Sequence, residues 1–124
     1  MILIIDDHVD TGEVLVKLLK TRNHKAVAVI NARVGLAVSK AVRPEAIVLD
    51  MMMPDVDGIT FLRQLRQHPR LHDVPVLVYS GDFTTEKMRE AKALGAGDYL
   101  VKGTVSWDRV CDAVEVLAST AQSA

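Results

Sequence analysis

The sequence has little of two residue types whose abundance defines particular classes of protein. It contains one cysteine, Cys111, so no internal disulfide can form and no second thiol stands at metal-ligand spacing. Aromatic residues make up 4% of the chain whereas hydrophobic residues make up 49%. The core must therefore be built mainly from aliphatic side chains and methionine. The cysteine content favours a reducing, cytoplasmic location.

The sequence also lacks an excess of either charge and any long apolar run. Fifteen Lys and Arg residues face 16 Asp and Glu residues, for a formal net charge of -1. This balance offers no basic surface for nucleic acid or for anionic lipid. The opening segment, MILIIDD, has no cationic region, and its apolar run is too short for a signal peptide or a membrane span. We therefore expect no nucleic-acid binding by this domain and no membrane span.

The length and the hydrophobic pattern predict one domain of the α/β class. At 124 residues the chain corresponds to about one domain. Apolar runs of strand length alternate with segments of helical periodicity, and these runs cover residues 2–5, 26–30, 46–49, 74–79 and 99–101. They are too uninterrupted for antiparallel strands with one wet face. The pattern predicts a (βα)5 unit with a parallel sheet and helices on both faces. We assign residues 1–120 to this domain and residues 121–124 to a short tail or the start of a linker.

Local signals mark where the helices begin and end. Asp10 and Glu13 have the spacing of a capping box and predict the start of the first helix there. Thr84 or Thr85 is expected to cap the fourth helix, and Gly95 to end it. Prolines are expected in the connections, namely Pro44, Pro69 and Pro75.

Polar residues follow four of the five predicted strands at their carboxyl ends, where open α/β sheets bind ligands. They are Asp6 and Asp7, then Asp50, Ser80 and Lys102. Clustered carboxylates repel one another unless a hard cation such as Mg²⁺ neutralises them. With that cation and a lysine to offset charge, one carboxylate can attack a phosphoryl group. Asp50 is the candidate nucleophile, because Asp6 and Asp7 adjoin each other on another strand.

Four motifs in this order resemble the receiver domain of two-component response regulators, the CheY-like family. They are IIDD at the first strand end, VLDMMMPDVDG around Asp50, VYSG at Ser80 and GAGDYLVK leading to Lys102. The resemblance covers essentially the whole chain, and the combination is far more specific than any one motif. It implies a flavodoxin-like, doubly wound three-layer α/β/α fold with strand order 2-1-3-4-5.

The resemblance also implies a metal site around a phospho-acceptor. Asp50 would be the phospho-acceptor of a phosphorelay. Asp7 and Asp50 would bind Mg²⁺ directly, together with the backbone carbonyl of Met52, and Asp6 would act mainly through water. The Met52 side chain would then be free to vary.

The remaining implied roles concern the switch and its partners. Ser80 would be the switch hydroxyl, Tyr99 the aromatic switch residue and Lys102 the phosphate-binding ammonium. A sensor histidine kinase or phosphotransfer protein would supply the phosphoryl group. The surface formed by the fourth helix, fifth strand and fifth helix would bind a downstream protein, an output domain or a second copy in a homodimer. The protein would be a signalling switch that is phosphorylated and dephosphorylates itself, not a turnover enzyme.

Two departures from the family pattern bear on these roles. Gly103 stands where the family usually has proline. Because a non-proline cis bond costs about 3 kcal/mol, we expect a trans Lys102–Gly103 bond and a looser loop. This departure leaves open a receiver-like interaction module that is not phosphorylated. His8 replaces a commonly acidic residue. We expect a solvated loop residue there, and contact with the metal or phosphoryl site is the less favoured alternative. The other histidines are expected at the surface: His24, His68 and His72.

The segment DVDGIT at residues 55–60 suggests a rival function. The pattern DxDGxT also opens the active site of haloacid-dehalogenase-like phosphatases, which use an Asp nucleophile and Mg²⁺. That motif must follow directly on a buried strand, whereas MMMP intervenes here. We therefore rank this alternative below the receiver domain.

Overall fold

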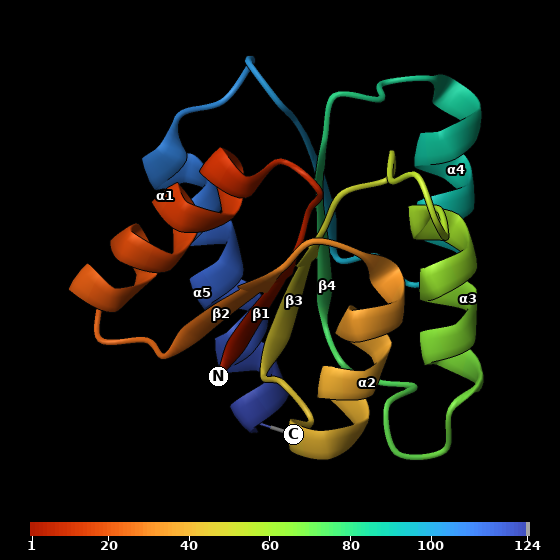
Figure 1. Cartoon of the computed structure of the whole chain (residues 1–124), viewed down its shortest axis with the longest axis horizontal. Helices are drawn as coiled ribbons and strands as arrows, with labels where there is room; N and C mark the ends of the chain where they lie inside the picture. Colours follow the sequence, from red (N-terminus) through yellow and green to blue (C-terminus); the bar gives the residue numbers. More distant parts are fainter. Residues whose placement is uncertain (124) are drawn as a thin grey trace.

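The computed structural model describes residues 1–123, in which five strands and five helices alternate along the chain (Figure 1). Each strand is short and is followed by a helix, and the first four helices return the chain to the end of the sheet where the next strand begins. In chain order, the elements are β1 (Ile2–Ile5), α1 (Val9–Thr21), β2 (Ala26–Val29), α2 (Ala32–Val42), β3 (Ala46–Leu49), α3 (Gly58–Gln67), β4 (Val76–Ser80), α4 (Thr85–Ala93), β5 (Asp98–Val101) and α5 (Trp107–Ser123).

The strands form one sheet in the order β2-β1-β3-β4-β5, and all four pairings are parallel. This confirms the predicted (βα)5 class and strand order. The predicted start of the fourth strand at Val74 is wrong, because β4 begins at Val76. Pro75 cannot donate to the ladder, although its carbonyl accepts a hydrogen bond from the Ile47 N–H at 2.9 Å. Because all five strands are parallel, their carboxyl ends lie at the same end of the sheet, at the top of Figure 1.

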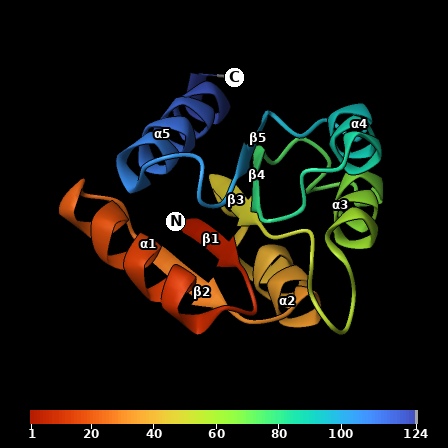
Figure 2. The same ribbon diagram turned by 90° about the horizontal axis from the view of Figure 1, so that it is seen from above.

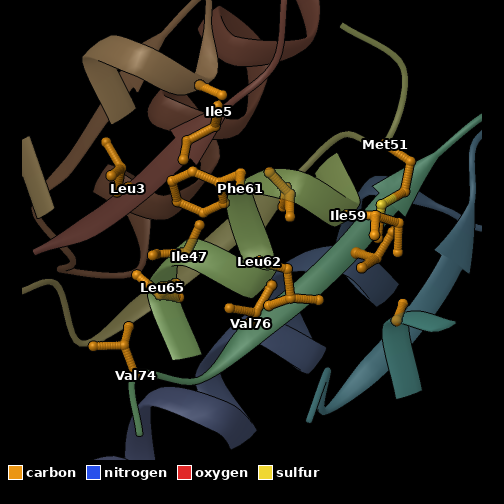
Figure 3. Packing of buried hydrophobic residues seen from close by; sticks show 14 of the residues in the cluster. Leu3, Ile5, Ile47, Met51, Ile59, Phe61, Leu62, Leu65, Val74 and Val76 are labelled. Carbon is orange, nitrogen blue, oxygen red and sulfur yellow. The ribbon is translucent and has the colours of Figure 1, made fainter. Parts of the chain in front are cut away.

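Helices cover both faces of the sheet, so the domain has three layers (Figure 2). Residues that alternate along β1 divide between two cores: Leu3 and Ile5 face α2, α3 and α4, whereas Ile2 and Ile4 face α1 and α5. All four side chains are fully buried. Figure 3 shows Phe61 of α3 packed beside Leu3 and Ile5 in the first of these cores. The uninterrupted apolar strands therefore reflect burial on both faces.

Two of the three predicted helix signals are correct. The Thr84 hydroxyl accepts a hydrogen bond from the Lys87 N–H and caps α4, and Gly95, with a φ of +81°, follows its end. The capping box of Asp10 and Glu13 is wrong. Helix α1 begins at Val9 with His8 as its N-cap, and no side chain caps it. Asp10 instead lies within the first turn, where its charge favours the helix dipole.

The connection after β5 and the end of the chain complete the fold. None of the peptide bonds between residues 1 and 123 is cis, which confirms the trans bond predicted at Gly103. Gly103 has a φ of +85°, a conformation that favours glycine. Helix α5 continues to Ser123; the predicted tail at 121–124 stays a prediction, and Ala124 lies outside the described residues. No helix within the described part is long and apolar enough to cross a bilayer.

Candidate functional site

The acidic residues at the carboxyl end of the sheet come together because their strands are neighbours. Strands β1 and β3 pair directly, with Ile5 opposite Leu49, and the next residue on β3, Asp50, donates its N–H to the Ile5 carbonyl at 3.0 Å. Asp6 follows Ile5 in the same way. Asp6 and Asp50 are 4% and 2% exposed, so two carboxylates from distant parts of the chain are buried side by side.

One atom from each of four side chains could bind a common ion. Side-chain ligand atoms of Asp6, Asp7, His8 and Asp50 all lie within 4.8 Å of one another. The Oδ1 atom of Asp7 is buried and has no hydrogen-bond partner among the described residues. An unpartnered carboxylate oxygen is costly to bury unless a cation compensates it. The oxygen-rich ligand set and this oxygen both fit a divalent cation such as Mg²⁺.

Lys102, the residue after β5, supplies positive charge to the same cluster. Its Nζ lies 2.7 Å from Asp6 Oδ2 and 3.6 Å from Asp50 Oδ2. The Lys102 N–H also donates to the Ser80 carbonyl at 2.9 Å, which fixes the chain at this position. Burial raises the pKa of Asp6, and the charge of Asp50 adds to this rise, although the hydrogen bonds from Lys102 and from the His8 backbone oppose it. The single ammonium group of Lys102 therefore does not fully offset the negative charge of the carboxylates.

Ser80 ends β4 beside the Asp50 carboxylate. Its hydroxyl donates to Asp50 Oδ1 at 2.8 Å, and the Met52 N–H donates to the same oxygen at 3.2 Å. The other oxygen, Oδ2, faces Lys102 and His8. Asp50 Oδ1 is therefore satisfied by hydrogen bonds, whereas Oδ2 lies among charged groups.

Tyr99 lies on β5 and reaches the loop after β4, away from the carboxylates. Its hydroxyl donates to the Asp82 carbonyl at 2.5 Å, and burial raises the pKa of Tyr99 to about 12. The Asp82 N–H in turn donates to the Ser80 hydroxyl at 3.3 Å. Asp82 therefore connects Ser80 with Tyr99 through its backbone.

The three methionines after Asp50 occupy different environments. Met51 and Met53 are buried, whereas Met52 is 56% exposed. A Cβ atom at Gly58 would lie 2.6 Å from the Met51 sulfur and 2.8 Å from the Asp50 carbonyl oxygen, so α3 can begin this close to the site only at a glycine. The Met52 side chain has no such constraint, as its predicted role requires. Its carbonyl as a metal ligand stays a prediction.

His8 is exposed and lies outside the helices and strands, as expected of a solvated loop residue, and its imidazole also reaches the acidic cluster, which was the alternative. Its side chain is 67% exposed, but Nδ1 lies 3.3 Å from Asp6 Oδ1 and 3.4 Å from Asp7 Oδ1. It lies 3.9 Å from Asp50 Oδ2. The sequence signal was the adjacency of His8 to Asp7. The predicted start of α1 near Asp10 placed His8 in a longer loop and obscured its contact with the cluster.

The DVDGIT segment lies beyond the acidic cluster. The Asp57 carboxylate accepts the Thr60 N–H at 2.8 Å and caps α3. Asp55 is exposed in the turn before it. Neither aspartate belongs to the four-residue ligand cluster. These positions give no support to the phosphatase alternative.

An open hollow of about 380 Å³ adjoins Lys102 at the same edge. It is lined by Gly81, Phe83, Val101, Lys102 and Thr104. Phe83 is 71% exposed, and a Cβ atom at Gly81 would meet nothing within 4 Å. The side of the cluster next to Lys102 is therefore accessible to a partner molecule.

Comparisons with known proteins agree with this geometry. The family model described as response regulator receiver domain matches residues 2–115. The sensory/regulatory protein RpfC of Xanthomonas campestris pv. campestris is 32% identical over an alignment 124 residues long, which covers 98% of this chain but 17% of RpfC. Protein PilH of Pseudomonas aeruginosa is 30% identical over 102 residues, covering 82% of this chain and 84% of PilH. The receiver domain structure of the Francisella response regulator 1452 is 26% identical, with a TM-score of 0.86 over 96% of both chains.

Proposed function

This chain belongs to the response regulator receiver domain family of two-component systems, and from this premise we propose that Asp50 is its phospho-acceptor. The observation that carries the proposal is the Asp50 carboxylate itself. It is buried at the end of β3, with Ser80 on one oxygen and Lys102 beside the other, within the acidic cluster. A buried carboxylate in such surroundings is typical of a reactive group.

The proposed cofactor is Mg²⁺. Asp7 and Asp50 would bind it directly, together with the Met52 carbonyl, and Asp6 would act through water. The buried, unpartnered Asp7 Oδ1 supports this assignment. The cation would offset negative charge on the carboxylates and on the phosphoryl oxygens.

The proposed reaction is a phosphoryl transfer from a phosphohistidine of a sensor histidine kinase or phosphotransfer protein. An Asp50 oxygen attacks phosphorus, the phosphorus–nitrogen bond breaks, and its electron pair stays on the donor imidazole. The product is an acyl phosphate, which water later hydrolyses back to the carboxylate. The Lys102 ammonium, 3.6 Å from Asp50 Oδ2, is placed to attract the phosphoryl oxygens in both steps.

The proposed switch uses the connection from Ser80 to Tyr99. A phosphoryl group on Asp50 would attract the Ser80 hydroxyl, which at present donates to Asp50 Oδ1. Asp82 is bonded to Ser80 through its N–H and to Tyr99 through its carbonyl, so a shift at Ser80 would pass to β5. Phosphorylation would thereby change the surface of α4, β5 and α5 and its affinity for partners.

The remaining assignments follow from this switch. We assign the chain to the cytoplasm and to signalling, with no catalytic turnover beyond its own phosphorylation and dephosphorylation. The α4, β5 and α5 surface would bind a downstream protein, an output domain or a second copy. We assign residues 1–120 to the receiver domain and residues 121–124 to a tail or linker.

Incubation with acetyl phosphate and Mg²⁺ tests the proposal. Mass spectrometry should detect the addition of one phosphoryl group that hydroxylamine removes, because acyl phosphates are labile to hydroxylamine. Asp50→Asn should abolish the adduct, and Asp55→Asn, which changes an exposed aspartate five residues on, should retain it.

The same experiment distinguishes the interaction module that is not phosphorylated. Gly103, in place of the family's usual proline, is the feature that favours this second candidate. An adduct on Asp50 excludes it. A chain that binds Mg²⁺ but forms no adduct with acetyl phosphate, or with a phosphorylated histidine domain, would overturn the proposed phospho-acceptor and favour the passive module.

A further inference from the structure

We propose that His8 is a ligand of the cation site and shifts its preference from Mg²⁺ toward first-row transition-metal ions such as Co²⁺, Ni²⁺ and Zn²⁺. The inference rests on the proposed function, because it concerns the same acidic cluster. It adds a nitrogen ligand, from a residue of this chain, to a set of carboxylate oxygens.

The distances from His8 to the carboxylates are those of ligands that share an ion. Divalent zinc-like ions hold nitrogen and oxygen ligands at about 2.0 to 2.2 Å, so two ligands at octahedral or tetrahedral angles lie about 2.8 to 3.6 Å apart. His8 Nδ1 lies 3.3 Å from Asp6 Oδ1 and 3.4 Å from Asp7 Oδ1, both within this range. The distance of 3.9 Å to Asp50 Oδ2 requires only a small adjustment.

Both the backbone and the side chain of His8 hold it in this position, since Nδ1 is also within hydrogen-bond distance of Asp6 Oδ1 at 3.3 Å. The His8 N–H donates to Asp6 Oδ1 at 2.8 Å, and His8 is the N-cap residue of α1. An N-cap side chain commonly accepts a hydrogen bond from the helix, but the His8 side chain makes no such bond. Its imidazole is directed at the carboxylates instead.

Two carboxylate oxygens lie opposite the imidazole. Lys102 binds Asp6 through Oδ2, which leaves Asp6 Oδ1 on the side of His8. The buried Asp7 Oδ1 has no hydrogen-bond partner among the described residues, and His8 Nδ1 lies 3.4 Å from it. A cation between these three atoms would compensate the Asp7 oxygen and accept the imidazole lone pair.

The chemistry of the nitrogen ligand determines which ions benefit. Mg²⁺ takes oxygen ligands almost exclusively and retains several waters. Imidazole suits Fe, Ni, Cu and Zn, and affinity for nitrogen ligands rises along the series toward Cu²⁺. A site with His8 among carboxylates should therefore favour transition metals over Mg²⁺ by more than a site of oxygens alone.

Calorimetric titration with Co²⁺ and with Mg²⁺, without any phosphodonor, tests this inference. The protein is stripped of metal and compared with His8→Phe, which keeps an aromatic ring but removes the nitrogen. Loss of a ligand or of its supporting residue weakens metal binding by about tenfold or more, so Co²⁺ affinity should fall by at least that factor in His8→Phe. Mg²⁺ affinity should not fall with it.

Visible absorption of bound Co²⁺ provides a second readout. The spectrum reports the ligands directly, so His8→Phe should change its band positions, whereas a purely structural effect would lower only the fraction bound. His72→Phe is the matched control, because His72 lies exposed in another loop, and it should leave both readouts unchanged. Thermal midpoints of the metal-free variants verify that each is folded.

Three results would overturn the inference. They are an unchanged Co²⁺ affinity in His8→Phe, an equal loss for Co²⁺ and Mg²⁺, and an equal loss of Co²⁺ binding in His72→Phe. The proposed function fails by a different observation, the absence of an Asp50 adduct. If Asp50 is phosphorylated but His8→Phe has the same ratio of Co²⁺ to Mg²⁺ affinity as the wild type, the role of His8 is refuted and the proposed function stands.

Discussion

The two ends of the parallel sheet differ in how their buried charged groups are compensated. At the carboxyl end, the carboxylates of Asp6 and Asp50 are buried beside each other, and the ammonium of Lys102 is shared between them. At the amino end, the half-buried guanidinium of Arg66 on α3 is surrounded by backbone carbonyls. Its hydrogen bonds join the end of α3 to the segments that precede β4 and β5.

Arg66 is almost completely satisfied by these carbonyls. Its Nε donates to the Leu94 carbonyl at 2.7 Å and its Nη2 to the Gly95 carbonyl at 3.1 Å. Its Nη1 donates to the carbonyls of His72 and Val74, at 2.9 and 2.7 Å. Burial lowers the pKa of Arg66, as it does for any cation removed from water. Hydrogen bonds compensate this cost, so the residue stabilises the fold.

The comparison indicates which end is built for stability and which for binding. Burial opposes ionisation at both ends, since it lowers the pKa of Arg66 and raises the pKa of Asp6. Only at the carboxyl end is a buried charged atom, Asp7 Oδ1, left without a hydrogen-bond partner among the described residues. That deficit is the feature a cation would correct.

The largest expected effect on stability is at the amino end. Arg66→Met keeps the aliphatic stem but leaves four carbonyls without their donor, and hydrogen bonds to charged groups contribute about 1.5 to 3 kcal/mol each, not additively. We expect the free energy of unfolding to fall by about 3 kcal/mol. Urea denaturation measures it, and Arg63→Met, at an exposed position on the same helix, is the control. A loss no greater than that of the control would contradict this account.

Mg²⁺ should produce a similar effect at the other end. A ligand at about 100 times its dissociation constant stabilises the folded state by about 2.7 kcal/mol. The thermal midpoint of the wild type should therefore rise with Mg²⁺, and that of Arg66→Met should rise as much from a lower value. Asp7→Asn should lose most of the increase. An increase of equal size in Asp7→Asn would show that Mg²⁺ binds elsewhere.

Removing a carboxylate from the metal-free cluster should have a smaller and opposite effect. Asp50→Asn keeps an oxygen for the Ser80 hydroxyl but removes repulsion with Asp6. Two like charges about 4 Å apart repel by about 4 kcal/mol at the effective dielectric of a protein, and the attraction to Lys102 that the substitution also removes offsets most of this, so the free energy of unfolding should rise by about 1 kcal/mol. Chemical denaturation in the presence of a chelator measures it. A decrease would show that Lys102 already overcompensates the cluster.

The smallest expected effect is that the contributions of Asp6 and Asp73, one at each end of the sheet, to folding stability depend on pH in opposite directions. Burial raises the pKa of Asp6, so the folded state binds its proton more tightly, and the stability Asp6 contributes is present below pH 3.8 and lost as the pH rises through the folded pKa. The hydrogen bond from Arg43 lowers the pKa of Asp73. Its contribution is present above pH 3.8 and lost as the pH falls through the folded pKa.

Asn variants at these two positions measure this difference. Relative to the wild type, Asp6→Asn should gain stability as the pH rises through the weakly acidic range in metal-free buffer. Asp73→Asn should be less stable than the wild type at neutral pH, and this difference in stability should disappear as the pH falls. Thermal midpoints across that range are the measurement, and slopes of the same sign for both variants would contradict the assigned pKa directions.

The sequence was sufficient to predict the elements and the residues at the carboxyl ends of the strands. Uninterrupted runs such as Ile2–Ile5 indicate strands buried on both faces, and a parallel sheet necessarily brings its carboxyl ends to one edge. Asp6, Asp7, Asp50 and Lys102 were found in this way, because their positions depend on local pattern and on topology. Their neighbourhood required no knowledge of side-chain packing.

Other features were decided by the tertiary structure. The contacts of Arg66 join residues as far apart as 66 and 95, and no local pattern distinguishes it from Arg63. The position of His8 depended on where α1 begins relative to the edge of the sheet, which the capping signal at Asp10 misplaced. Hydrophobic periodicity is encoded locally and can be read directly, whereas the compensation of a buried charge depends on which distant atoms the fold brings within hydrogen-bond distance.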